Sequence, residues 1–229
     1  MPQVGATGGA NRLSVDFLSG LLSEARIPLP PGAAEKLVLH AEEMLAWNRS
    51  IRLTAITAPE EVAVKHILDS LTLLAFAPFP GRTLDFGSGA GYPGIPLAVA
   101  LPDAHLVLFE ASAKKCAFLS RACALLRLGN AEVVRGRLEA SGPPPGRFEQ
   151  IVTRATLPPG AAARLLGPCL SPGGRLLLMV GPGEARRRPA RGGAGMELPP
   201  GMKEGRCVSF ALPYKMGSRE IREILTAGG

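Results

Sequence analysis

The spacing of apolar residues along the chain changes character near residue 81. Before that point, apolar residues recur at steps of three and four, which is typical of amphipathic helices. We predict helices at Leu13–Ala25, Ala33–Arg49 and Pro59–Phe76. The last of these begins with a proline followed by two glutamates, a favourable helix N-terminus.

After residue 81, short apolar runs alternate with segments of helical spacing. The runs predict strands at Thr83–Phe86, Leu106–Glu110, Ala131–Val134, Phe148–Thr153 and Arg175–Val180. Helices are expected between them at Gly94–Leu101, Ala113–Leu128 and Pro159–Leu170, followed by a closing strand at about Val208–Leu212 and a short helix near Arg219–Leu225. Strands separated by helices favour an α/β fold with a doubly wound, mostly parallel sheet.

These patterns divide the chain into parts of different composition. Residues 1–11 lack periodicity and predict a disordered tail. We expect an N-terminal helical extension over 12–80 and a nucleotide-binding core over 81–229. Within the core, residues 181–196 are rich in glycine, proline and arginine and predict a flexible basic linker.

A glycine-rich loop follows the first predicted strand, within Leu84–Gly94 (LDFGSGAGYPG). Gly87, Gly89 and Gly91 allow the backbone to turn sharply and to approach a ligand without a Cβ in the way. In doubly wound sheets this position, at the carboxyl end of the first strand, binds nucleosides. The alternative is an ordinary tight turn between a strand and a helix.

The loop also satisfies the dinucleotide fingerprint G-x-G-x-x-G, from Gly89 to Gly94, and Glu110 follows 21 residues after Gly89. Glu110 is expected to bind ribose hydroxyls, but an adenosine ribose occurs in both NAD and S-adenosylmethionine. Pro93 and Pro96 remove amide donors that a pyrophosphate would need at the following helix. Asp85 adds a negative charge that would repel a pyrophosphate and attract a methionyl ammonium. These residues favour S-adenosylmethionine over a dinucleotide.

Three further residues stand at the ends of predicted strands. Leu138 and Glu139 follow the third strand, where an apolar contact and a polar group could address adenine. Arg154 follows the fourth strand and is expected at the mouth of the crevice, in contact with both cofactor and substrate. The alternative for all three is an ordinary loop leucine and surface charges.

The formal charge of +7 is unevenly distributed. Residues 1–80 carry 6 Lys/Arg against 8 Asp/Glu, whereas residues 81–229 carry 20 against 11. A basic half beside a cofactor site favours an anionic partner, with nucleic acid the leading candidate. The run from Arg186 to Arg191 could bind phosphates or could be a solvated linker.

The remaining composition narrows the classes of protein that fit. No apolar run is long enough to predict a transmembrane helix, and the first residues do not resemble a secretory signal. The four cysteines have neither the spacing of a metal site nor that of a CxxC pair, so we expect no metal and a reduced, cytoplasmic compartment. We expect a monomer.

Several segments together resemble the RsmG (GidB) family of bacterial methyltransferases that act on guanine N7 in small-subunit ribosomal RNA. The segments, which lie within residues 40–180, are Trp47–Arg49, Leu53–Ile56, His66–Ser70, Asp85–Ala98, Lys114–Leu119, Arg137–Glu139 and Thr153–Ala155. The resemblance implies a Rossmann-like class I methyltransferase fold and 16S ribosomal RNA as the partner. It also implies that Gly87, Tyr92, Leu138, Glu139 and Arg154 bind S-adenosylmethionine.

The chain departs from the family at several positions on the expected RNA side. Arg52 stands where the family usually has asparagine, Thr153 where it has serine, and Val180-Gly181 where a lysine usually precedes the glycine. The closing strand also lacks the family's basic pair. These departures leave open an altered RNA or a small-molecule substrate. An NAD-dependent oxidoreductase, from the G-x-G-x-x-G match, and an RNA-binding protein that has lost turnover also stand as alternatives.

No arrangement of residues in the sequence indicates a nucleophile or a general base. The histidines are His40, His66 and His105, and none has the spacing of a catalytic pair with Ser, Cys or Asp. Guanine N7 carries no proton and needs no base, which agrees with this absence. We predict that His66 packs against the domain rather than acting in catalysis, and that Arg154 is the catalytic residue.

Overall fold

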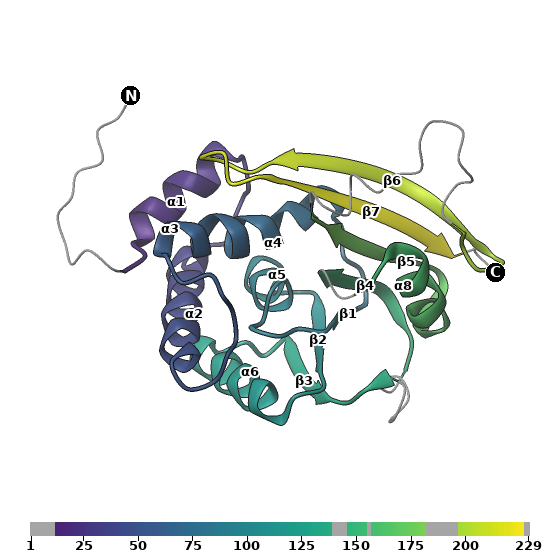
Figure 1. The fold of residues 1–229 in the computed structure, drawn as a ribbon, viewed down its shortest axis with the longest axis horizontal. Helices are drawn as coiled ribbons and strands as arrows, with labels where there is room; N and C mark the ends of the chain where they lie inside the picture. Colours follow the sequence, from purple (N-terminus) through teal and green to yellow (C-terminus); the bar gives the residue numbers. More distant parts are fainter. Residues whose placement is uncertain (1–11, 139–145, 155–156, 182–196, 227–229) are drawn as a thin grey trace.

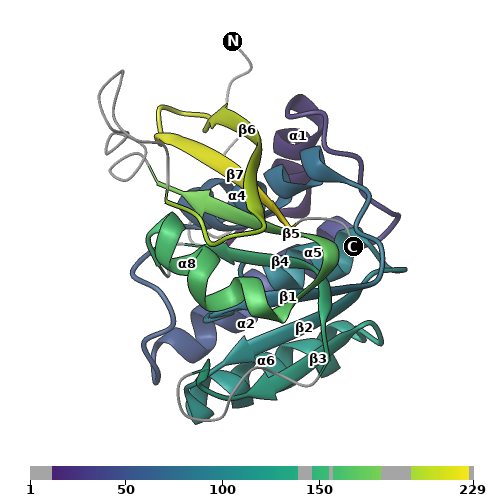
Figure 2. The same ribbon diagram turned by 90° about the vertical axis from the view of Figure 1, so that its right-hand side faces the viewer.

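The computed structural model describes residues 12–138, 146–154, 157–181 and 197–226, and its centre is one seven-stranded sheet (Figures 1 and 2). The strand order is β3-β2-β1-β4-β5-β7-β6. The first five of these strands run parallel, and β7 and β6 are antiparallel additions beside β5. The strands are β1 (Arg82–Phe86), β2 (His105–Glu110), β3 (Ala131–Arg135), β4 (Phe148–Arg154), β5 (Leu170–Val180), β6 (Met202–Ala211) and β7 (Ser218–Thr226). The predicted doubly wound, mostly parallel sheet is confirmed.

Helices cover both faces of this sheet (Figure 1). On one face, α5 and α6 pack against the strands, and the N-terminal helices pack on them in turn. On the other face lies α8 with the short 3-10 turn η3. The helices are α1 (Val15–Glu24), α2 (Ala33–Asn48), α5 (Gly94–Ala100), α6 (Ala113–Leu126), α8 (Pro159–Leu166) and η3 (Gly167–Cys169).

The central strands are apolar on both sides because both sides are covered. In β2, Leu106 and Leu108 belong to the core cluster beneath α5 and α6, whereas Val107 and Phe109 belong to the cluster beneath α8. The same alternation continues in β5. Continuous apolar runs in the sequence are therefore explained by burial on two faces, as the predicted parallel sheet requires.

The predicted helix at Pro59–Phe76 exists but is irregular. It comprises α3 (Pro59–Val62), the π-helical turn η1 (Ala63–Leu68), α4 (Asp69–Leu71) and the 3-10 turn η2 (Thr72–Phe76). Within the π turn, the amide of Asp69 donates to the carbonyl of Val64, five residues earlier. Such turns are rare and often lie at functional sites.

The helix predicted near Arg219–Leu225 is wrong, because this segment is the strand β7. Its isoleucines, Ile221 and Ile224, are three residues apart, which is a helical spacing. In β7 they point to opposite faces of the sheet and are fully buried in different core clusters. A spacing of three fits a helix with one buried face, but it fits equally well a strand that is covered on both faces.

Two strand boundaries also differ from the expectation. The strand β5 begins at Leu170 rather than Arg175, because Leu170 already pairs with Phe148 of β4; Ser-Pro-Gly-Gly at 171–174 forms an irregularity before the pairing resumes at Arg175. The strand β6 begins at Met202 rather than near Val208, since its polar first half lies exposed at the sheet edge. The remaining predicted elements agree with the structure to within a few residues.

Some expectations fall outside the described residues: the tail 1–11, nearly all of the linker 181–196, the arginine run 186–191, and Glu139. The boundary between an extension at 12–80 and a core at 81–229 stays a prediction. In the part of the chain that the structure describes, no helix is long and apolar enough to cross a membrane. Nor do the described His, Cys, Asp and Glu residues form a group of three that could hold a metal ion.

Candidate functional site

The glycine loop connects the carboxyl end of β1 to α5 and takes a conformation that requires glycine. The φ angles of Gly87, Gly89 and Gly91 are 77°, 56° and 85°, in the left-handed region. A Cβ at Gly91 would also lie 2.5 Å from the side chain of Ile95 and 3.0 Å from His40. Backbone conformation therefore favours glycine at all three positions, and lack of space also requires it at Gly91.

Most of the loop amides already donate to acceptors within the protein. Gly87 and Ser88 donate to the carbonyl of Phe109, and Gly91 donates to the carbonyl of Ser88. The amide of Gly89 donates to a carboxylate oxygen of Glu110 at 3.0 Å. A pyrophosphate needs free amides at such a loop, and these are engaged.

Asp85 lies beneath the loop rather than at its surface. Its side chain is fully buried, and its Oδ2 accepts a hydrogen bond from the amide of Gly94 at the start of α5, at 3.1 Å. Burial raises the pKa of Asp85 to about 7, against the opposing effect of the bonds from Ser88 and Gly94. Its Oδ1 is buried without a hydrogen-bond partner among the described residues. The negative charge of Asp85 is thus weaker than the full charge that the sequence predicted. A cation beside Oδ1 would restore it.

Glu110 ends β2 and faces the loop, as the sequence predicted. One carboxylate oxygen accepts the bond from Gly89, and the other accepts from the amide of Ser112 at 2.8 Å. Each oxygen has a second lone pair, so the carboxylate can still accept hydrogen bonds from two vicinal hydroxyls. The residue types therefore fit an adenosine ribose at this position.

Tyr92 is buried between two histidines of the N-terminal helices. Its ring lies 4.6 Å from that of His66, nearly parallel, and 4.7 Å from that of His40. Only 3% of Tyr92 is exposed, and its hydroxyl has no partner among the described residues. Its side chain therefore fixes the loop to the helices, which leaves the backbone as the part of Tyr92 that is available to a ligand.

Arg154, at the carboxyl end of β4, is held by the helical segment beneath it. Its guanidinium donates to the carbonyl of Lys65 at 3.1 Å, to Oδ2 of Asp69 at 3.4 Å and to Nδ1 of His66 at 3.3 Å. It also lies 5.7 Å above the ring of Tyr92. The predicted position at the mouth of the crevice is consistent with its place at the end of β4, beside the glycine loop.

His66 is packed, as predicted. It is 5% exposed, and burial together with the charge of Arg154 lowers its pKa to about 3. Because Arg154 can only donate, Nδ1 of the neutral imidazole is the acceptor, and Nε2 donates to the hydroxyl of Thr54 at 2.9 Å. Its one lone pair is thus engaged, so His66 cannot serve as a base in this state.

Two residues of this site were missed from the sequence, Asp69 and Arg219. Asp69 is fully buried, and Arg219 of β7 bonds both of its oxygens, at 2.6 and 2.7 Å. A charged residue inside an apolar helical run does signal a buried partner, but that partner lies 150 residues away. Leu138 follows β3 and packs against the cluster of α8; its predicted contact with adenine stays a prediction.

Comparison with known proteins decides the family. Residues 33–187 match the model of the family described as rRNA small subunit methyltransferase G (GidB). The chain belongs to this family. A relative from Anaeromyxobacter sp. named ribosomal RNA small subunit methyltransferase G is 38% identical over 89% of this chain and 94% of its own length. A relative of the same name from Geobacter sulfurreducens is 36% identical over 89% and 95%. The family resemblance drawn from the motifs is thus confirmed.

Solved structures agree on the fold. An O-methyltransferase from Bacillus cereus, in complex with SAH, has a TM-score of 0.57 at 15% identity and covers 93% of this chain and 100% of its own. The O-methyltransferase TomG from Streptomyces achromogenes, in complex with SAM, has a TM-score of 0.57 at 19% identity and covers 92% and 96%. The predicted Rossmann-like class I methyltransferase fold is therefore confirmed.

Proposed function

We propose that this protein transfers a methyl group from S-adenosylmethionine to N7 of a guanine in 16S ribosomal RNA. The observation that carries the proposal is membership of the rRNA small subunit methyltransferase G family over most of the chain. The glycine loop supports the cofactor independently, because most of its amides are engaged internally and its neighbour Asp85 is acidic. Both features disfavour the alternative of an NAD-dependent oxidoreductase.

The cofactor would lie across the carboxyl ends of β1 and β2. Gly87, Gly89 and Gly91 let the backbone approach it, and Glu110 accepts from the ribose hydroxyls. Oδ1 of Asp85 is buried and has no hydrogen-bond partner among the described residues. Its negative charge would attract the methionyl ammonium of the cofactor across the glycine loop. We assign the adenine contacts to Leu138 and Glu139, and further contacts to the backbone of Tyr92 and to Arg154.

Methylation of guanine N7 needs no general acid or general base. When bound, S-adenosylmethionine supplies an electrophilic methyl group, and the N7 lone pair lies in the ring plane and carries no proton. The buried, neutral His66 beside Arg154 agrees with a site that has no general base. Catalysis would rest on holding N7 in line with the methyl group, an effect worth roughly 7–11 kcal/mol at its upper end. We assign to Arg154 the contact that holds the guanine in this position.

Cations near the carboxyl edge of the sheet, four of them exposed and Lys115 half-buried, support an anionic substrate. They follow β2, β3 and β6 along the chain, on the same edge as the glycine loop. Ribose phosphates would contact such side chains, and affinity for the RNA would fall with salt. The cations are Lys114, Lys115, Arg135, Arg137 and Lys215. We further expect a monomeric, cytoplasmic enzyme that needs no metal.

Incubation of the purified protein with methyl-labelled S-adenosylmethionine and small ribosomal subunits from an unmethylated strain tests this function. We expect the label in 16S ribosomal RNA as 7-methylguanosine, with free 16S RNA and transfer RNA compared in parallel. Label in another nucleoside, or only in a small molecule from a cell extract, would contradict the proposed substrate. Absence of transfer to any acceptor would contradict the activity itself.

A further inference from the structure

The Asp69 carboxylate joins three parts of the chain that are far apart in sequence. It belongs to α4, which lies between α5 and the β6–β7 hairpin (Figure 1). Arg219 of β7 donates to both of its oxygens, and Arg154 of β4 donates to one of them. Asp69 has no exposed surface, whereas the side chains of Arg154 and Arg219 are 17% and 13% exposed.

The geometry of this cluster leaves Arg219 and Arg154 with different tasks. Arg219 forms the bidentate pair, with short bonds that fix the orientation of the carboxylate. Arg154 takes the longer, third bond, and it also donates to the carbonyl of Lys65 and to Nδ1 of His66. Arg219 therefore fixes the orientation of the Asp69 carboxylate. That carboxylate and the π turn together fix the position of the Arg154 guanidinium.

The charges of the cluster do not balance. One carboxylate faces two guanidiniums, and His66 is neutral, so these four groups together carry a net positive charge. A partly buried surplus charge of this kind is costly for stability alone. It is useful where an electron-rich or anionic group is to be placed against one of the two arginines.

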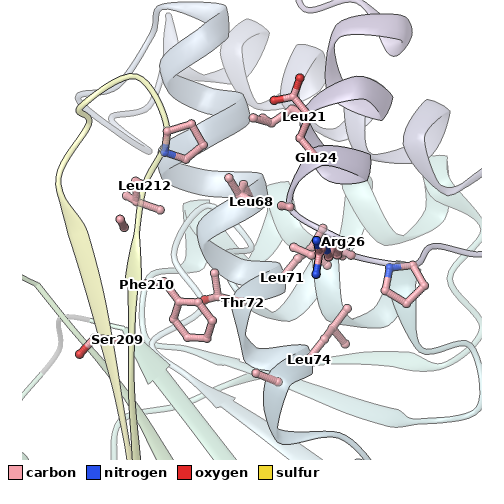
Figure 3. A pocket seen from close by; sticks show the side chains of 16 residues that line it. Leu21, Glu24, Arg26, Leu68, Leu71, Thr72, Leu74, Ser209, Phe210 and Leu212 are labelled. Atoms are coloured by element: carbon pink, nitrogen blue, oxygen red, sulfur yellow. The ribbon is translucent and has the colours of Figure 1, made fainter.

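The β6–β7 hairpin and the helical segment share one core cluster, but they do not pack together along their whole length. A pocket of about 670 Å³ lies between the hairpin, the helical segment and the end of α1. Figure 3 shows Leu68, Leu71 and Thr72 of the helical segment among its lining residues, with Phe210 of β6 and Leu212 just after it. Apolar contact along this part of the seam is therefore incomplete. The Arg219–Asp69 pair is correspondingly more important in fixing the hairpin to the helix.

We propose that Asp69 and Arg219 are positioning residues for methyl transfer, which hold the Arg154 guanidinium in its productive orientation. The inference rests on the proposed function for the role of Arg154. It makes the C-terminal hairpin part of the active site through Arg219, although Arg219 itself is committed to Asp69. A loosened guanidinium would lower the rate of the chemical step more than it would weaken RNA binding.

The Arg219→Gln variant tests this inference best, because it leaves one carboxylate paired with one guanidinium and should still fold. We expect kcat to fall on the order of 10-fold, with the KM for small ribosomal subunits changed less than about twofold. Arg219→Lys should recover part of the loss. The control is Arg222→Gln, which removes the ion pair of Arg222 with Glu220 in the same strand and should leave kcat unchanged.

Two further measurements separate positioning from a merely structural role. The loss in Arg219→Gln should not multiply with that of Arg154→Lys in the double variant, because both act through the same guanidinium. The 15N chemical shift of Nδ1 in His66, which reports whether this atom accepts a hydrogen bond, should change in Arg219→Gln without any cofactor present. Asp69→Asn, where it folds, should behave like Arg219→Gln.

The inference is overturned if folded Arg219→Gln keeps the kcat and the His66 shift of the wild type, or if the two losses multiply. A rise in KM and a flatter salt dependence at unchanged kcat would instead make Arg219 an RNA contact, and would also overturn it. If the wild-type protein transfers no methyl group, the proposed function fails. The His66 shift still reports whether Arg219 orients Arg154 in that case.

Discussion

Gly87→Leu should have no measurable affinity for S-adenosylmethionine. Leucine at a φ of 77° costs roughly 1–2 kcal/mol in the backbone, and its side chain would enter the space that we assign to the adenosyl group. Calorimetric titration with S-adenosylmethionine and with NAD measures both the loss and the choice of cofactor. The wild-type protein should bind the former and not the latter.

The matched control for this variant is Gly32→Leu. Gly32 has nearly the same φ, 76°, at the start of α2, and no atom lies within 4 Å of an added Cβ. This substitution should cost a similar stability in thermal unfolding and leave the dissociation constant unchanged. Retained affinity in Gly87→Leu, or an equal loss of affinity in both variants, would mean that the loop does not hold the cofactor.

Arg154→Lys should lower kcat/KM for methyl transfer on the order of 100-fold while the protein stays folded. Lysine retains the charge but lacks the planar fork that reaches three acceptors of the helical segment at once. The measurement is steady-state kinetics with small ribosomal subunits, together with thermal unfolding.

Arg175→Lys is the control for Arg154→Lys. Arg175 is also partly buried and bonds the carbonyl of Pro78, the side chain of Gln150 and Glu223, near the opposite edge of the sheet. The Arg175→Lys variant should be less stable than the wild type and should keep its methyl-transfer activity. Full activity of Arg154→Lys would remove Arg154 from the site, and an equal loss of activity in both variants would indicate damage to the fold.

Much of the core could be predicted from the sequence because local rules coincide there with tertiary structure. The strands β1 to β5 are apolar runs between helical segments, and the glycines of the loop are required by its backbone. The seven motif segments identified the family without any contact information. These features depend on residues that are close together in the chain, so the sequence pattern alone can predict them.

What could not be predicted depends on partners far away in the chain. The isoleucines of β7 fit a helix by their spacing, but β5 and β6 pair with the segment at its two edges and the two core clusters bury its two faces. Asp85 was expected to act as a full charge at the loop, but its burial beneath α5 raises its pKa. The pairing of Asp69 with Arg219 spans 150 residues, and no local pattern indicates it. The π turn that presents Lys65 and His66 to Arg154 has no sequence signal that we recognise.

Mapping of N7-methylguanine in 16S ribosomal RNA from a strain that lacks this gene tests the central claim most directly. We predict that one such modification disappears in the deletion strain, returns with the wild-type gene, and does not return fully with Arg154→Lys. If every N7-methylguanine of the wild-type RNA persists in the deletion strain, the protein is not the methyltransferase proposed.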